Sequence, residues 1–367
     1  MCSKLIRIRI SEPYITHEEI NAIVNVLKSG RLSMGEIVRR FEEEFARYIG
    51  VRHAIATSSG TTALYAALYA LKLRDCEVVT TAFSFIASAN AILYVGCKPI
   101  FADIDPRTFN IDPEDILNKI TNRTKAVLIV HLFGQPCDMK SIMEIVRDYN
   151  LTLIEDACQA HGAEYNGVKV GSFGDVAVFS FYATKNITTG EGGMVVTNND
   201  DIARRVRLFI NQGQDRKYHH VILGFNFRMT EIQGALGIQQ LKKLEYLNNR
   251  RIQNARYLTN GLRRLSTIET PYELPNVKHV YHQYVIKADN RDELMKYLIN
   301  KGVEARIHYP LPIYKQPLYV KLGYGGIRLH NTEEVVKRVL SLPVHPKLDK
   351  DELNMIISEI YRFYREE

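Results

Sequence analysis

Short apolar runs alternate with helical stretches between about residues 54 and 196. The runs that resemble strands are Glu77–Thr81, Pro99–Asp103, Ala126–His131, Leu151–Glu155, Val176–Phe181 and Met194–Thr197. The clearest helical stretches between them are Thr61–Leu73, Pro113–Ile120 and Met139–Asn150. This alternation predicts an α/β fold with a mostly parallel sheet and helices on both of its faces. In such sheets ligands bind at the carboxyl ends of the strands, so candidate chemistry is sought there.

The hydrophobic pattern changes near residue 240. Apolar residues at helical spacing run from Leu241 to Leu262 and suggest a long helix that leaves the first domain. Prolines then punctuate a region of shorter elements, and a terminal helix is expected at Lys350–Arg365. A chain of 367 residues also exceeds the usual size of one domain. We therefore expect a three-layer large domain over residues 1–245 and a smaller C-terminal α/β domain over residues 246–367.

Composition and charge narrow the class of protein. The chain is 46% hydrophobic and 24% charged, with a formal net charge of +7, as in soluble globular proteins. Its basic residues are interleaved with apolar ones, which favours solvated helix faces or an anionic small substrate over nucleic acid. We expect a cytoplasmic protein, because no apolar stretch suits a membrane span and residues 1–10 lack a signal-peptide core. Five cysteines without a CxxC pair predict neither disulfides nor a metal site.

Asp156 is the first candidate for chemistry. It ends the run LTLIED, in which apolar residues lead directly to two carboxylates. A buried carboxylate is costly unless a cation or several hydrogen-bond donors meet it. Neighbouring side chains on a strand point to opposite faces, so Glu155 and Asp156 should diverge, and one of them should have a structural partner. Taken alone, such an acid could equally cap the following turn.

Lys185 is the second candidate. It lies in YATKNITTG, directly after an apolar run, and no other basic residue occurs for many positions on either side. Apolar surroundings disfavour the ammonium form of lysine, and only the neutral amine attacks a carbonyl to form a Schiff base. In isolation, a surface lysine whose charged end reaches solvent would explain the same residue.

The run TSSGTTALYAAL is the third candidate. Small residues lead directly into a helical stretch, whose free N–H groups and positive dipole end suit a phosphate. The same residue types are also routine helix caps. Other phosphate motifs fail on inspection: SGRLSMGEI lacks the Lys-Ser/Thr pair of a P-loop, and GEGGMV lacks the third glycine of a dinucleotide fingerprint.

One cofactor would account for all three candidates. Pyridoxal phosphate (PLP) offers a phosphate to the helix N-terminus, a ring nitrogen to the acid and a carbonyl carbon to the lysine. Together the candidates favour a PLP enzyme whose cofactor is held as a Schiff base on Lys185.

Longer motifs extend this interpretation. In chain order they are SGRLSMG, SSGTTAL, AFSFIASANAI, EDACQAHGA, GSFGDVAVFSF, TKNITTGEGG, GFNFRMTEIQGALG and RIHYPLP. With these motifs in this order, the chain resembles the DegT/StrS family of sugar aminotransferases, within the aspartate-aminotransferase (type I) fold of PLP enzymes, from about Pro13 onward. The resemblance implies ping-pong Schiff-base transfer of an amino group from glutamate, or occasionally glutamine, to a nucleotide-linked keto sugar.

The resemblance also implies roles for individual residues. Lys185 would carry the cofactor, and Asp156 would pair with its ring nitrogen. Gln159 would reach its phenolic oxygen, and Phe85 would stack on its ring. The residues that would hold its phosphate are Gly60, Thr61 and Ser180.

A partner subunit is implied as well. Asn226 resembles an asparagine that the neighbouring subunit donates to the phosphate, which implies a homodimer with shared active sites. Candidates for sugar contacts are His308, Tyr309 and Tyr314, although local packing would explain these side chains equally well. His161 has no role that we can derive, and we expect a structural histidine with satisfied hydrogen bonds.

Two alternatives stay open. A PLP-dependent sugar dehydratase would share the cofactor site, but a few relatives of that kind carry histidine in the position of Lys185, and lysine favours transamination. A cofactor-binding regulator or nucleic-acid binder would fit the basic charge. A protein that only binds needs no Schiff-base lysine, which argues against it.

Overall fold

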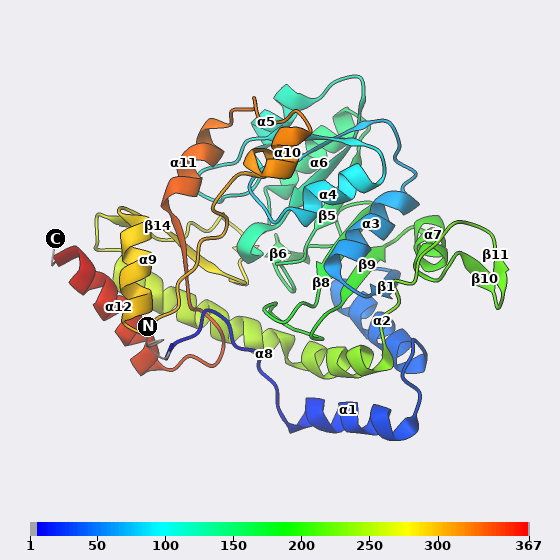
Figure 1. Ribbon diagram of the computed structural model, residues 1–367, viewed down its shortest axis with the longest axis horizontal. Coiled ribbons are helices and arrows are strands. Elements are labelled where there is room, and N and C mark those ends of the chain that lie inside the picture. Colours follow the sequence, from blue (N-terminus) through cyan, green and yellow to red (C-terminus); the bar gives the residue numbers. More distant parts are fainter. Residues whose placement is uncertain (1–5, 366–367) are drawn as a thin grey trace.

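A seven-stranded sheet forms the centre of the computed structural model, which describes residues 6–365 (Figure 1). The strand order is β1-β9-β8-β5-β4-β2-β3. The strands are β1 (His53–Thr57), β2 (Glu77–Thr81), β3 (Lys98–Ala102), β4 (Thr124–Val130), β5 (Thr152–Asp156), β8 (Val176–Ser180) and β9 (Gly193–Thr197). In this sheet β9 alone runs antiparallel to its neighbours, β8 and β1. The predicted mostly parallel sheet is confirmed.

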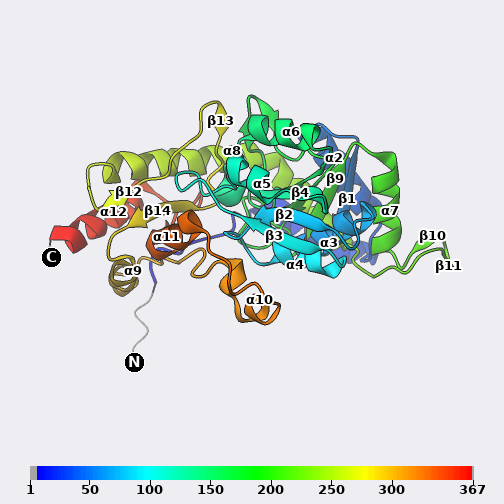
Figure 2. The ribbon, with the colours of Figure 1, turned by 90° about the horizontal axis from the view of Figure 1, so that it is seen from above.

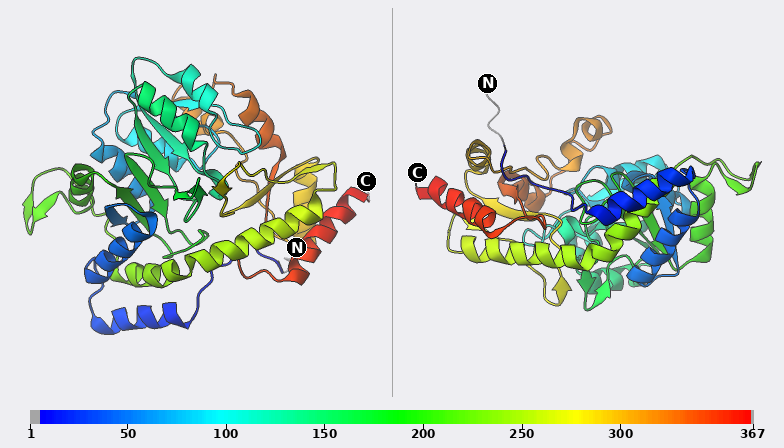
Figure 3. Two further views of the ribbon diagram at one scale, coloured as in Figure 1. Left: turned by 180° about the vertical axis from the view of Figure 1, so that it is seen from behind. Right: turned by 90° about the horizontal axis from the view of Figure 1, so that it is seen from below.

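Helices cover both faces of this sheet (Figures 2 and 3). Val78 and Ile154 pack toward α3 and α4, whereas their chain neighbours Val79 and Leu153 pack toward α5 and α6. Because both faces are buried, the strands are almost continuously apolar. The covering helices are α2 (Glu36–Ile49), α3 (Gly60–Ala70), α4 (Ala87–Tyr94), α5 (Pro113–Lys119), α6 (Met139–Asp148) and α7 (Asp200–Ile210).

The long helix α8 (Glu231–Leu262) runs under the large sheet and on to a second lobe (Figure 1). That lobe has its own core and a three-stranded sheet in the order β12-β14-β15. The predicted boundary at residue 245 falls inside α8, so the division into residues 1–245 and 246–367 stays a prediction. Ile8 pairs with Val303 and belongs to the second core, which ties the start of the chain to this lobe. The elements of the second lobe are β12 (Ile268–Glu269), β14 (Tyr284–Ala288), α9 (Arg291–Asn300), α11 (His330–Arg338), β15 (Val339–Leu342) and α12 (Lys350–Arg365).

Several elements fall outside the predicted pattern. The strand β1 and the helices α1 and α2 were not among the predicted elements, and a short β10–β11 hairpin projects from the large lobe (Figures 1 and 2). The remaining elements are α1 (His17–Ser29), η1 (Leu132–Gly134), β6 (Glu164–Tyr165), β7 (Val168–Lys169), β10 (Gln214–Arg216), β11 (His219–His220), β13 (Val277–Lys278), η2 (Ile313–Lys315) and α10 (Pro317–Lys321).

The described residues cover four of the five cysteines and only part of the N-terminal segment. Cys2 and the rest of residues 1–5 lie outside the described residues. The four described cysteines, Cys76, Cys97, Cys137 and Cys158, are free thiols. Across residues 6–365, no helix is both long enough and apolar enough to cross a membrane.

Candidate active site

The two acids at the end of β5 point to opposite faces of the sheet. The Glu155 carboxylate is fully buried and accepts a hydrogen bond from His131 Nε2 at 3.0 Å. It also accepts backbone N–H bonds from Gly171 (2.7 Å), Phe173 (2.9 Å) and Gly174 (2.7 Å). Glu155 is therefore the structural acid of the pair, and the predicted divergence is confirmed.

Asp156 faces the opposite side, toward α4. The Ser88 hydroxyl donates to its Oδ2 at 2.7 Å, and the Cys158 N–H donates to its Oδ1 at 3.1 Å. The residue is only 4% exposed, and among the described residues no cation forms an ion pair with it. An ionised carboxylate has about four acceptor positions, so Asp156 retains capacity for a charged donor.

Lys185 lies on the loop that leaves β8, close enough to Asp156 and Cys158 for their charges to act on it. Burial lowers the pKa of its ammonium group, and the two neighbours oppose that shift. No carboxylate of the described chain forms an ion pair with it. The predicted loss of solvation is confirmed, and it favours the neutral amine.

The start of α3 is packed tightly against the end of β8. A Cβ on Gly60 would lie 2.7 Å from the Cβ of Ser180 and 3.3 Å from the Sγ of Cys158, so only glycine fits there. Ser59 caps the helix by accepting a bond from the Thr62 N–H at 3.2 Å. The first N–H groups of a helix, here those of Gly60 and Thr61, have no acceptor within the helix. The predicted cradle of Gly60, Thr61 and Ser180 is thus brought together beside Cys158.

Gln159 connects the large lobe with the RIHYPLP segment. Its Oε1 accepts the Phe133 N–H at 2.8 Å, and its Nε2 donates to the Tyr309 hydroxyl at 3.2 Å. The Tyr309 ring lies 6.3 Å from that of Phe85, centroid to centroid, at an angle of 40°. Phe85 is 57% exposed, so much of its ring is available to a ligand.

The three predicted sugar contacts fare differently. Tyr309 lies at the site. Burial lowers the pKa of His308 to about 4, and the charges of Arg306 and Lys185 add to this effect, so His308 also lies near the site. The Nδ1 of His308 lies 2.9 Å from the Ser341 Oγ. Tyr314 is fully buried in a separate core cluster, and its hydroxyl donates to Glu333 at 2.9 Å. The packing alternative therefore describes Tyr314, and we no longer count it as a sugar contact.

Asn226 is exposed, and the next residue, Phe227, accepts the Ser58 N–H at 2.8 Å, so this segment lies beside the start of the predicted phosphate cradle. The Oδ1 of Asn226 accepts a hydrogen bond from Arg228 Nε at 2.9 Å, and the Asn226 backbone pairs with Asn211. The Asn226 side chain is therefore bonded to Arg228 and not to a residue of the cradle.

His161 is buried, as expected of a structural histidine, but the expectation that its hydrogen bonds are satisfied was wrong. His161 is fully buried between Phe179 and Phe181, at centroid distances of 5.4 and 5.6 Å. Within residues 6–365 neither of its ring nitrogens has a hydrogen-bond partner. Burial, assisted by the charge of Lys185, lowers its pKa to about 3. His161 is therefore a neutral ring in an apolar layer beneath the site.

Ser88 was missed by the sequence interpretation, although it holds the candidate acid. It lies within AFSFIASANAI, one of the motifs that carries the resemblance. Ser84 and Ser88 are both buried, four residues apart and with hydroxyls 3.5 Å apart, so they share one face of an otherwise apolar segment. That spacing is the signal that could have revealed it.

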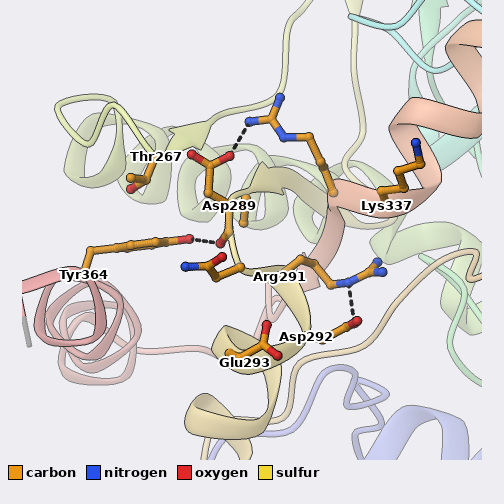
Figure 4. A pocket seen from close by; sticks show the side chains of 10 residues that line it. Thr267, Asp289, Arg291, Asp292, Glu293, Lys337 and Tyr364 are labelled. Atoms are coloured by element: carbon orange, nitrogen blue, oxygen red, sulfur yellow. Dashed lines mark hydrogen bonds and ion pairs between the residues drawn. The ribbon is translucent and has the colours of Figure 1, made fainter. Parts of the chain in front are cut away.

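A polar groove of about 650 Å³ on the second lobe contains none of the predicted residues (Figure 4). Its charged groups neutralise one another: Arg338 pairs with Asp289 at 3.1 Å and Arg291 with Asp292 at 2.7 Å. Across residues 6–365, no group of three or more His, Cys, Asp or Glu side chains could hold a metal ion. The cluster around Lys185 is therefore the candidate active site.

Comparison with known proteins agrees with this geometry. The chain belongs to the DegT/DnrJ/EryC1/StrS aminotransferase family, whose model matches residues 13–361. It is 39% identical to the GDP-perosamine synthase of Caulobacter vibrioides, over 98% of both chains. It is also 39% identical to the pleiotropic regulatory protein of Geobacillus stearothermophilus, over 97% of both. The structure of NtdA from Bacillus subtilis, with the cofactor PMP bound, has a TM-score of 0.89 at 34% identity, covering 98% of this chain and 86% of that one.

Buried histidines make the stability depend on pH. Burial lowers the pKa of His161 and His279 to about 3 and of His308 and His345 to about 4, and places that of His282 well below its ordinary value. In the unfolded chain these groups titrate near pH 6.5. As the pH falls below about 6.5, the unfolded state binds protons that the folded state refuses, so stability decreases by up to about 1.4 kcal/mol per pH unit per histidine.

Urea unfolding at about pH 7.5 and pH 5.5 measures this effect. The free energy of unfolding should be clearly lower at the acid pH, and His345→Gln should reduce the difference. Equal stability at the two values would contradict neutral burial of these histidines.

Proposed function

We propose that the protein is a PLP-dependent aminotransferase that moves an amino group from glutamate or glutamine to a nucleotide-linked keto sugar. The observation that carries the proposal is the combination of Lys185 and Asp156. Lys185 is a lysine of lowered pKa, and near it the buried Asp156 carboxylate has no ion-pair partner among the described residues. Membership of the family and its relative named GDP-perosamine synthase support the reaction and the sugar-nucleotide class.

The residues present fit PLP at each of its binding groups. The start of α3, with Gly60 close against Ser180, suits the phosphate because the first N–H groups of the helix have no acceptor within it and the Ser180 hydroxyl lies beside them. Asp156 suits the ring nitrogen because it retains acceptor capacity for a charged N–H. Phe85 offers an exposed ring face, and Gln159 offers an amide N–H. When bound, PLP supplies a carbonyl carbon for the lysine and a ring that withdraws electrons from the amino-bearing carbon.

Lys185 and Asp156 would have different roles in the reaction. The neutral amine of Lys185 is both the nucleophile that holds the cofactor and, once released, the base that moves a proton between carbon atoms. Asp156 would hold a proton on the ring nitrogen, since its buried carboxylate would otherwise have no cationic partner. Ser88 would keep that carboxylate oriented through its 2.7 Å hydrogen bond.

Two alternative functions are disfavoured. A sugar dehydratase of this family could share the cofactor site, but lysine at position 185 favours transamination. The name of the Geobacillus relative raises the possibility of a regulator. A regulator that only binds a cofactor would need neither a desolvated lysine nor a cation-free carboxylate at its side.

A homodimer with shared sites completes the proposal. Asn226 would serve the phosphate of the neighbouring subunit, which agrees with its exposure on the single chain. His308 stays a candidate sugar contact. We expect neither nucleic acid nor a membrane among the partners, and a cytoplasmic location.

Asp156→Asn tests the acid. The variant should still bind PLP but lose turnover, because a neutral amide cannot hold the ring nitrogen protonated. Loss of a buried charge-assisted hydrogen bond costs about 2–3 kcal/mol, which corresponds to about 30–150-fold in rate. The measurement is release of the keto acid from glutamate or glutamine, with the exposed substitution Asp148→Asn as the control. Turnover at the parental rate in Asp156→Asn would reduce this acid to a cap at the end of the strand.

Mixing two inactive variants tests the shared site. Lys185→Ala and Asn226→Asp place their lesions in different subunits of the proposed dimer. In each mixed dimer one site would carry both lesions and the other neither, so up to about half of the sites should recover after subunit exchange.

The matched control mixes Lys185→Ala with Asp156→Asn. Both of these residues would serve the site of their own subunit, so no intact site can form. If the first mixture stays as inactive as the control while light scattering shows folded, exchanging dimers, Asn226 does not serve a partner's site.

A further inference from the structure

The hydrogen bonds of Gln159 determine which way its amide points. Its Oε1 accepts the Phe133 backbone N–H at 2.8 Å, and a backbone N–H can only donate. The amide nitrogen must therefore be the end that faces Tyr309, at 3.2 Å from its hydroxyl oxygen. Gln159 is 4% exposed, whereas Tyr309 is half-buried, so the bond lies at the inner end of the tyrosine side chain.

The direction of this bond leaves the proton of Tyr309 available. An amide nitrogen donates and does not accept, so the tyrosine oxygen is the acceptor in the pair. Burial raises the pKa of the Tyr309 hydroxyl, and this effect outweighs the hydrogen bond from Gln159, which lowers the pKa, so the group keeps its proton. Among residues 6–365, no acceptor is found for that proton. A protonated donor beside a buried amide, without an acceptor on the described chain, points to a ligand atom.

The surroundings of Tyr309 indicate where that ligand atom lies. The Tyr309 ring contacts Phe83 and Phe85, each at a centroid distance of 6.3 Å, and its hydroxyl lies at Gln159. Asp156 is near enough to act on its charge state. The tyrosine proton and the second N–H of Gln159 therefore start from two atoms 3.2 Å apart and could reach one ligand atom together.

We propose that Tyr309 is a positioning residue that donates its hydroxyl proton, together with Gln159, to the ionised phenolic oxygen of the cofactor. This inference rests on the proposed function and replaces the expectation that Tyr309 contacts the sugar. It gives the phenolic oxygen one donor from each lobe, because Tyr309 lies three residues after Arg306, whose backbone pairs with Ser341 in the strand β15 of the second lobe.

The proposal has a consequence that can be measured without turnover. A donor to the phenolic oxygen stabilises its negative charge and so weakens the attraction that this charge exerts on the imine proton. The pKa of the imine formed with Lys185 is therefore lower when Tyr309 is present. The other titratable or charged groups that act at the site are Asp156, Cys158, His161, Arg251, His282 and His308, and a Tyr309→Phe substitution leaves all of them in place.

The experiment is an absorbance titration of the PLP-loaded holoenzyme between about pH 5 and pH 10. Tyr309→Phe should raise the pKa of the imine by about 1 to 2, the value expected for losing one hydrogen bond to a charged group. Tyr314→Phe is the matched control, because Tyr314 belongs to the same segment as Tyr309 but its hydroxyl donates to Glu333 outside the site. It should leave the pKa unchanged.

Three outcomes separate the claims. A raised pKa in Tyr309→Phe alone supports the role of Tyr309. An unchanged pKa in a Tyr309→Phe enzyme that still shows the imine absorbance overturns that role and leaves the proposed function intact. Absence of any imine absorbance in the parent enzyme overturns the proposed function, and the role of Tyr309 with it.

Discussion

Burial of the Lys185 amine, which disfavours its charged form, is the constraint on which the rest of the site depends. Burial lowers its pKa, while Asp156 and Cys158 act in the opposite direction, and the burial effect is the larger. A direct ion pair with Asp156 would stabilise the ammonium form instead. The described chain contains no such pair. The Asp156 carboxylate instead accepts one hydrogen bond from the Ser88 hydroxyl and one from the Cys158 N–H. On our account that separation leaves the amine free to attack and the acid free to receive a charged ring nitrogen.

The scaffold supports this arrangement through backbone contacts. Adjacent residues on β5 serve opposite purposes, because Glu155 ties down the loop around residues 171–174 while Asp156 faces the site. The close approach of Gly60 to Ser180 brings the N-terminus of α3 to the end of β8. A larger residue at position 60 would push the two elements apart and separate the proposed phosphate site from Lys185.

Local features of the sequence were the ones that could be predicted. The apolar runs fixed by double-sided burial, the acid that ends β5 and the small residues that start α3 all act over a few positions of the chain. Contacts between distant segments could not be predicted from spacing: Gln159 meets Tyr309 across 150 positions, and Tyr314 in the same segment turns into a separate core. The hydrogen bonding of His161 could not be predicted for a similar reason. Its apolar neighbours Phe179 and Phe181 come from β8 and from the loop that follows β8.

Borohydride reduction of the PLP-loaded protein, followed by peptide mapping, tests the central claim most directly. Reduction converts the imine into a stable secondary amine and so marks the lysine that carried the cofactor. Our account predicts that the visible absorbance disappears and that the label is found on Lys185, in the peptide containing YATKNITTG. A label on another lysine, or a protein that binds PLP without any reducible bond, would contradict it.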